Sequence, residues 1–234
     1  QTYDGWIDLF GWGTSGYHNI YDNYNVNYQP YSASAVMVNE ECNYYGFGPS
    51  TNMNDPNLTE SSMEYDWGRY NSVINGGNHP EIWRTLSKEE WEYLFFSRST
   101  STINNTPNAR FVKAKVNDLG GVILFPDEFS VPQYLPVPLQ INNADAHFDS
   151  NSYSVEAWGV LENLGCVFLP ASGFRDKDLG IYNVVYNVWE CGYYWSTSYL
   201  SSRSAHLWFF GNIYGIDLSN KYRYVGASVR LVCD

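Results

Sequence analysis

Residue types that often perform catalysis are present in this chain, but their spacing supports no catalytic site. No Gly-x-Ser-x-Gly elbow occurs that would expose a serine nucleophile. Nothing fixes the distance between Asp22, Glu64 and Asp66, which general acid–base catalysis would have to bring together. The histidines are scattered and form no pair at helical spacing: His18, His79, His147 and His206. We therefore predict that the chain is not an enzyme.

The four cysteines leave two interpretations open. Cys42, Cys166, Cys191 and Cys233 include no C-x-x-C pair, which argues against a zinc ribbon or a thioredoxin-type centre. One or two disulfides would suit an exported protein. The apolar, strand-like runs beside Cys166 and Cys233 equally suit buried free thiols.

Two arginines stand in otherwise apolar contexts. Arg175 ends the run ASGFR, and Arg230 lies within SVRLV. One interpretation is that such an arginine recognises an anion. The commoner alternative is a buried arginine bonded to backbone carbonyls or to a carboxylate.

The stretch from Gly192 to Val232 predicts a strand with two different faces. Side chains alternate between the faces of a strand, so Ala205, Leu207 and Phe209 would share one face suited to a core. The opposite face would carry a second set, continued beyond a Gly211-Asn212 turn: His206, Trp208, Phe210, Asn212 and Tyr214. An amphipathic second face is either covered by more protein or binds a ligand.

Composition favours a recognition surface. Aromatic residues make up 18% of the 234 residues, with 21 Tyr and 9 Trp, whereas only 16% are charged. Tyr and Trp supply rigid contact area, and Ser, Gly and Asn supply adaptable hydrogen bonds. The net charge of −12 argues against nucleic acid and anionic membrane surfaces as partners. No apolar run approaches the length of a membrane span, so membrane insertion is not expected.

Local patterns predict an α+β fold in a single domain spanning residues 1–234. Ser87 and Glu90 form a capping-box pattern, which predicts a helix from about Lys88 to Arg98. Ser154 would cap a second helix that ends at Gly165. Residues 111–116 and 122–126 predict a hairpin, and residues 166–170 predict another buried strand. Residues 1–80 are loop-rich, and residues 192–232 form the segment that we expect to display ligand contacts.

Several segments resemble one superfamily. The chain contains, in this order, WRTLSKEEWEYL, VILFPDEF, VFLPASGFR, GYYWSTS and YRYVGASVRLV. These resemble the C-type-lectin-fold superfamily, which includes the formylglycine-generating (sulfatase-modifying) enzymes and the variable proteins of diversity-generating retroelements. The likeness covers roughly residues 5–232 and is greatest to exported bacterial paralogues that carry GWIDLFGWGTSG near the front.

The resemblance implies a C-type lectin-like fold, with two helices packed on a small mixed or antiparallel sheet and with long loops. In the retroelement proteins, fixed scaffold residues alternate with varied surface positions that bind ligand. The scaffold positions here would be Trp195, Ala205, Leu207, Phe209, Gly226, Ser228, Val229 and Arg230. The ligand-binding positions would be Ser198, Ser201, Ser202, Arg203, His206, Trp208, Phe210, Asn212, Tyr214, Tyr222 and Tyr224, and Trp189 to Cys191 would extend the same face.

These observations together predict a non-catalytic domain that binds a protein or glycan. We expect it to be secreted or on the surface of a bacterial cell, with diversification by a retroelement as one source of its binding face. The alternative is a structural or adhesive subunit of a surface fibre. A sulfatase-modifying activity is not expected, because it needs a close thiol pair and Cys191 lies far from Cys233 in the sequence.

No cofactor is predicted. A calcium-dependent sugar site needs a cluster of oxygen ligands, and the lectin tripeptides EPN, QPD and WND are absent. A structural calcium ion is left open without assigned ligands. The nearest candidates, Asp127-Glu128 and Asp176 with Asp178, are more simply solvated loop carboxylates.

Overall fold

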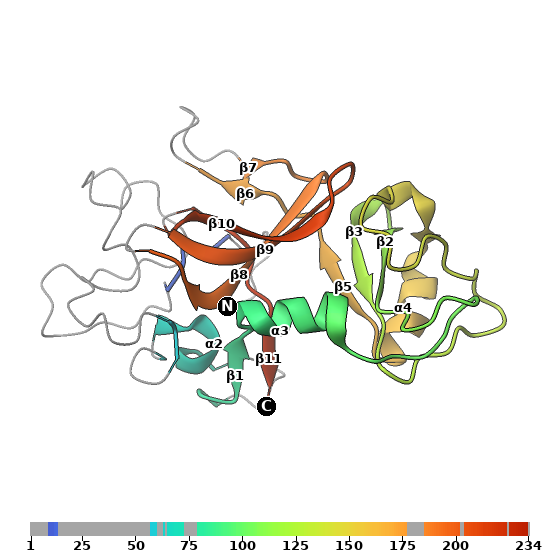
Figure 1. Ribbon diagram of the computed structural model, residues 1–234, viewed down its shortest axis with the longest axis horizontal. Coiled ribbons are helices and arrows are strands. Elements are labelled where there is room, and N and C mark those ends of the chain that lie inside the picture. Colours follow the sequence, from blue (N-terminus) through green and yellow to red (C-terminus); the bar gives the residue numbers. More distant parts are fainter. Residues whose placement is uncertain are drawn as a thin grey trace, which may run out of the picture.

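The computed structural model describes residues 9–13, 57–59, 63, 65–72, 79–176, 185–201, 204–223 and 225–233. Most of the predicted loop-rich segment 1–80 therefore lies outside the described residues. Within the described part the protein is a mixed α+β structure with more strand than helix, in agreement with the predicted class. Two lobes lie side by side (Figure 1).

The major lobe comprises described residues before 98 and after 170. Its centre is an antiparallel sheet in the order β10-β9-β8, built from β8 (Cys191–Tyr199), β9 (Ser204–Gly211) and β10 (Ile216–Tyr222). Two smaller antiparallel pairs flank it: β1 (Trp83–Thr85) with β11 (Leu231–Cys233), and β6 (Phe174–Arg175) with β7 (Val185–Tyr186). The short helix α2 (Trp67–Tyr70) packs beside β1.

The minor lobe is the continuous segment 98–170. Its sheet has the order β4-β2-β3-β5, with β4 (Ser152–Tyr153), β2 (Phe111–Val116), β3 (Leu119–Leu124) and β5 (Val167–Pro170). The helix α4 (Val155–Asn163) and a 3₁₀ turn, η4 (Phe148–Ser150), pack onto this sheet. Because β4 and β5 are the outer strands, each leaves one edge without a strand partner.

Both predicted helices are confirmed by their caps. Helix α3 (Lys88–Glu92) begins after Ser87, and both capping-box hydrogen bonds between Ser87 and Glu90 form. It continues as a π-helical turn, η3 (Tyr93–Ser97), so that Trp91 and Phe95 are both buried. In α4 the Oγ of Ser154 accepts from the backbone N–H of Ala157.

The predicted hairpin is confirmed, but its second strand begins earlier than expected. Asn117 and Asp118 both have positive φ, 47° and 67°, as a two-residue type I′ turn requires. Strand β3 therefore starts at Leu119 rather than at Val122. Gly120 was assigned to the turn, yet it lies in the strand, where an added Cβ would approach the Phe148 ring to 2.4 Å. Close packing explains this glycine.

The second face of β9 is buried, which corrects the predicted display surface. Trp208 and Phe210 are 0% exposed. Trp208 stacks on Trp91 of α3, with ring centroids 6.2 Å apart and an interplanar angle of 7°. Phe210 contacts Phe148 of the minor lobe edge-on at 6.3 Å. This face is therefore the core that joins the two lobes, and protein covers both side chains.

The other face of β9 matches its predicted role. Ala205 and Leu207 are 0% exposed and pack with Trp195 and Val225 in a separate core, with Phe209 partly buried against it. The three-stranded sheet therefore has protein on both faces.

Candidate binding cleft between the lobes

The predicted ligand-binding residues do not form one surface. Ser198 is buried, and its Oγ accepts from the backbone N–H of Lys88 at 3.1 Å, which ties β8 to α3. His206 is half-buried. Its pKa is lowered mainly by burial and, to a smaller extent, by the positive charge of Lys88. Ser202, Arg203 and Tyr224 lie outside the described residues.

Tyr214 and Tyr222 are exposed, but they lie at opposite ends of β10. Their exposed fractions are 52% and 48%. Strand β10 runs from Ile216 to Tyr222, a span of about 20 Å at about 3.4 Å per residue. The two tyrosines therefore cannot contact one small ligand. Ser201 is exposed in the turn between β8 and β9, at the Tyr222 end of the sheet.

The loop that carries Tyr214 is held by the minor lobe. Lys113 of β2 is 0% exposed, and its Nζ donates to the carbonyls of Gly211 and Tyr214 at 2.6 Å each. Asn212, predicted as a contact residue, instead accepts from the backbone N–H of Phe148 at 2.7 Å through its Oδ1. Burial lowers the pKa of Lys113 to about 8. These contacts fix the loop and direct the Asn212 side-chain oxygen toward the minor lobe.

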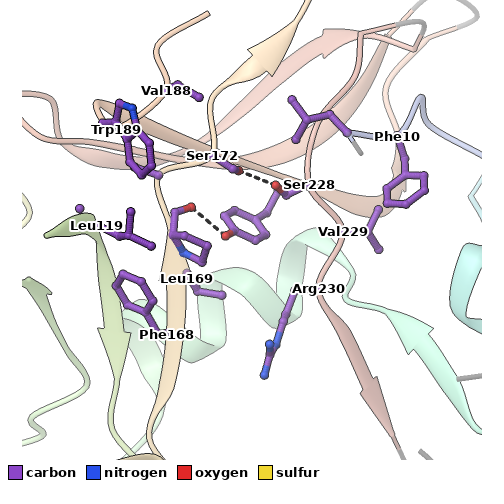
Figure 2. Close-up of a pocket in the computed structure, with 15 residues that line it drawn as sticks. Phe10, Leu119, Phe168, Leu169, Ser172, Val188, Trp189, Ser228, Val229 and Arg230 are labelled. Carbon is purple, nitrogen blue, oxygen red and sulfur yellow. Dashed lines mark hydrogen bonds between the residues drawn. The ribbon is translucent and has the colours of Figure 1, made fainter. Parts of the chain in front are cut away.

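An apolar cleft of about 420 Å³ lies between the lobes and is lined by residues of both (Figure 2). A cleft of this size with a few polar groups is the usual form of a small binding site. In Figure 2, Trp189, Leu119 and Phe168 lie on one side of the cleft, and Phe10 and Val229 lie on the other. The lining residues are Leu9, Phe10, Leu119, Gly120, Phe168, Leu169, Pro170, Ala171, Ser172, Val188, Trp189, Tyr194, Ser228, Val229 and Arg230.

A strained turn presents Trp189 at the cleft. Trp189 has a φ of 69° and Asn187 a φ of 54°, which bulky residues such as tryptophan rarely adopt. The turn is held because the Trp189 N–H donates to the Ala171 carbonyl at 2.9 Å and the Cys191 N–H donates to the Asn187 carbonyl at 2.9 Å. The Trp189 side chain remains 47% exposed. Backbone strain that leaves a large aromatic side chain in solvent is typical of a binding position.

Most of the polar groups in the cleft are bonded to one another. The Tyr194 hydroxyl donates to the Pro170 carbonyl at 2.9 Å, and the hydroxyls of Ser172 and Ser228 are 2.6 Å apart. Burial raises the pKa of Tyr194, so its hydroxyl stays protonated at neutral pH. Arg230 differs, because it is exposed and forms no hydrogen bond or ion pair with any residue that the structure describes.

Two of the described cysteine thiols are buried and are not activated as nucleophiles. Burial raises the pKa of the Cys166 thiol to about 12 and also raises that of Cys191, whereas a reactive thiol needs a lowered pKa. No group of three or more His, Cys, Asp or Glu side chains gathers as metal ligands in the described part of the chain. Asp127, one of the calcium candidates, pairs instead with Arg98 at 3.0 Å.

Comparison with known proteins adds no relative. No family model, no curated protein and no solved structure matches this chain. No helix among the described residues is long and apolar enough to cross a membrane.

A few residues that line the cleft were named from the sequence, but for other roles, and the cleft itself was not predicted. It assigned Ser228 and Arg230 to the scaffold and Phe168 to a buried strand, and it named Trp189 only as an extension of another face. The available signal was the apolar context of Arg230, which suggested anion recognition as one interpretation. Arg175, the other such arginine, is instead half-buried, and its backbone pairs with Gly226.

Proposed function

We propose that this chain is a non-catalytic ligand-binding domain that engages its partner at the cleft between the lobes. One observation carries the proposal: an apolar cleft of about 420 Å³ contains a half-exposed tryptophan, Trp189, and an arginine, Arg230, that pairs with no residue in the described part of the chain. Tryptophan and arginine are the residues most enriched among energetically dominant contacts in protein interfaces. The aromatic-rich composition of the chain supports the same function.

The proposed site replaces the C-terminal strand face. Trp208 and Phe210 belong to the core, whereas Tyr214 remains a candidate contact for a partner that extends beyond the cleft. We retain the C-type lectin-like fold and an exported, bacterial cell-surface location as parts of the proposal. The two longer helices and the small antiparallel sheet support the fold, and the segments quoted for the resemblance support the location.

The test is to probe peptide and glycan arrays with labelled protein and to compare two variants. Trp189→Ala removes the exposed ring in the cleft. Tyr134→Ala is the matched control, because Tyr134 is 75% exposed and does not line the cleft. We expect both variants to retain the far-ultraviolet circular dichroism of the native protein. Only Trp189→Ala should lose the bound array members. Binding that survives Trp189→Ala would exclude the cleft as the site.

A further inference from the structure

The edge of the minor-lobe sheet opens into the cleft. Strand β5 is the last strand of the order β4-β2-β3-β5, and Phe168, Leu169 and Pro170 line the cleft in succession. The Ala171 N–H donates to the Gly120 carbonyl, so every second residue of β5 bonds β3. Phe168 and Pro170 are the alternate residues, whose backbone groups point away from β3.

One backbone group on that edge is already hydrogen-bonded within the protein, and the next one is not. The Pro170 carbonyl, on the outward side, accepts a hydrogen bond from Tyr194 across the cleft. The N–H and carbonyl of Phe168 are the next outward pair, and no backbone partner outside the β3–β5 ladder bonds them among the described residues. An unpaired edge of this kind binds an extended peptide by adding it as a strand.

The walls of the cleft favour an apolar side chain over a sugar. A sugar presents many hydroxyl groups, and each one buried without a partner costs free energy. Ser172, Ser228 and Tyr194 have already used hydroxyl hydrogen bonds on protein partners. The remaining walls are hydrocarbon from Leu119, Phe168 and other apolar residues. An aliphatic or aromatic side chain needs no such partners.

One charge in the cleft selects the sign of the ligand. Arg230 is the only charged side chain among the described residues that line the cleft, and none of these residues neutralises it. Its positive charge lies close enough to Tyr194 to influence that hydroxyl's pKa. Guanidinium groups bind carboxylates through paired, charge-assisted hydrogen bonds. A ligand group next to the cleft is therefore expected to be a carboxylate.

We infer that the cleft binds an extended protein segment that pairs with the backbone of Phe168, inserts an apolar side chain beside Trp189 and sets a carboxylate against Arg230. The inference rests on the proposed function and names its ligand class. Among the described residues of β5, only Phe168 offers a backbone pair without a partner, so the interaction is short and its specificity lies in the side chain and the carboxylate.

The experiment uses three series of acetylated tetrapeptides. In the first, the last two positions vary over all apolar residues and the peptide ends in a free carboxylate. The second is the matching amide, and the third is an amide in which glutamate replaces the last apolar residue. Titration calorimetry with the full chain should give saturable binding for the first or third series. Comparison of these two series distinguishes a C-terminal carboxylate from a side-chain carboxylate. The second series, which has no carboxylate, should bind at least about tenfold more weakly than the better carboxylate series, because the charge-assisted hydrogen bonds to Arg230 are lost.

Protein variants and modified peptides test each contact. Arg230→Gln should reduce the affinity of the best carboxylate peptide about tenfold and leave its amide unchanged. Lys88→Gln, which removes one positive charge outside the cleft lining, should change neither. In a scan of singly N-methylated versions of the best peptide, methylation of at least one position should abolish most of the binding, because it removes a backbone N–H that pairs with Phe168.

Four outcomes overturn the inference. Equal binding of carboxylate and amide peptides excludes the role of Arg230. Tolerance of N-methylation at every position excludes strand addition at Phe168. Failure of all peptides, together with Trp189-dependent binding of a glycan, replaces the ligand class but leaves the proposed function intact. If neither peptide nor glycan binds in a Trp189-dependent way, the proposed function fails as well.

Discussion

Replacement of Trp208 by alanine should destabilise the protein severely. The Trp208 ring is 0% exposed and lies 4.7 Å from the Phe95 ring and 6.2 Å from the Trp91 ring, measured between centroids. Its removal loses the transfer free energy of the ring and leaves a cavity between α3 and β9. Measured Trp→Ala substitutions in protein cores cost about 3–5 kcal/mol in the free energy of unfolding.

A second substitution separates packing from hydrogen bonding. The indole Nε1 of Trp208 is buried and has no hydrogen-bond partner in the structure. Trp208→Phe therefore loses ring volume but no hydrogen bond, and we expect a smaller cost of about 1–2 kcal/mol. Tyr214→Ala, at an exposed aromatic residue of the same C-terminal segment, should change the free energy of unfolding by about 0.5 kcal/mol or less.

The assay is urea unfolding at 25 °C, followed by far-ultraviolet circular dichroism for the wild type and the three variants. The order of stability should be wild type and Tyr214→Ala, then Trp208→Phe, then Trp208→Ala. Wild-type stability of Trp208→Ala would contradict the burial of this face. That result would instead place Trp208 on an exposed face of β9.

Three further predictions concern titration and thiol access. Burial lowers the pKa of Lys113 in the folded protein to about 8, below its ordinary value of 10.5. Between these two pH values the unfolded chain binds more protons than the folded one, so stability should rise with pH. From pH 7 to pH 9.5 the free energy of unfolding should increase by about 2 kcal/mol in the wild type and not in Lys113→Met, as measured by denaturant unfolding. The hydrogen bond from Arg84 lowers the pKa of Glu90, so the stability that Glu90 contributes should be present above pH 4.5 and lost as the pH falls through the folded pKa. In Glu90→Gln the melting temperature should therefore fall less steeply at acid pH than in the wild type. An equally steep fall in both proteins would count against the ion pair. The exposed thiol of Cys233 should react with Ellman's reagent in the native protein, whereas the buried thiol of Cys166 should react only after unfolding; mass spectrometry of the labelled peptides identifies each site, and rapid native labelling of Cys166 would refute its burial.

The helices were predictable because their signals are local. The Ser87–Glu90 capping box and the Ser154 cap each occupy a few consecutive residues, and the structure forms both. The position of β3 was less predictable, because Gly120 resembles a turn residue in sequence. Its actual cause is the approach of Phe148, which is distant in sequence.

The faces of β9 show where sequence reasoning ends. Alternation correctly separated Leu207 from Trp208, but it cannot say what covers each face. That depends on α3 and on the minor lobe, which come much earlier in the chain. The cleft was inaccessible for the same reason, since Phe10, Phe168 and Arg230 come together only through tertiary structure.

The most direct test of the binding cleft is the dissociation constant of the best array ligand for the wild type, Trp189→Ala and Tyr134→Ala. We expect Trp189→Ala to weaken binding at least about tenfold, as loss of a dominant interface contact does, and Tyr134→Ala to have no effect. Equal dissociation constants for all three proteins would contradict it.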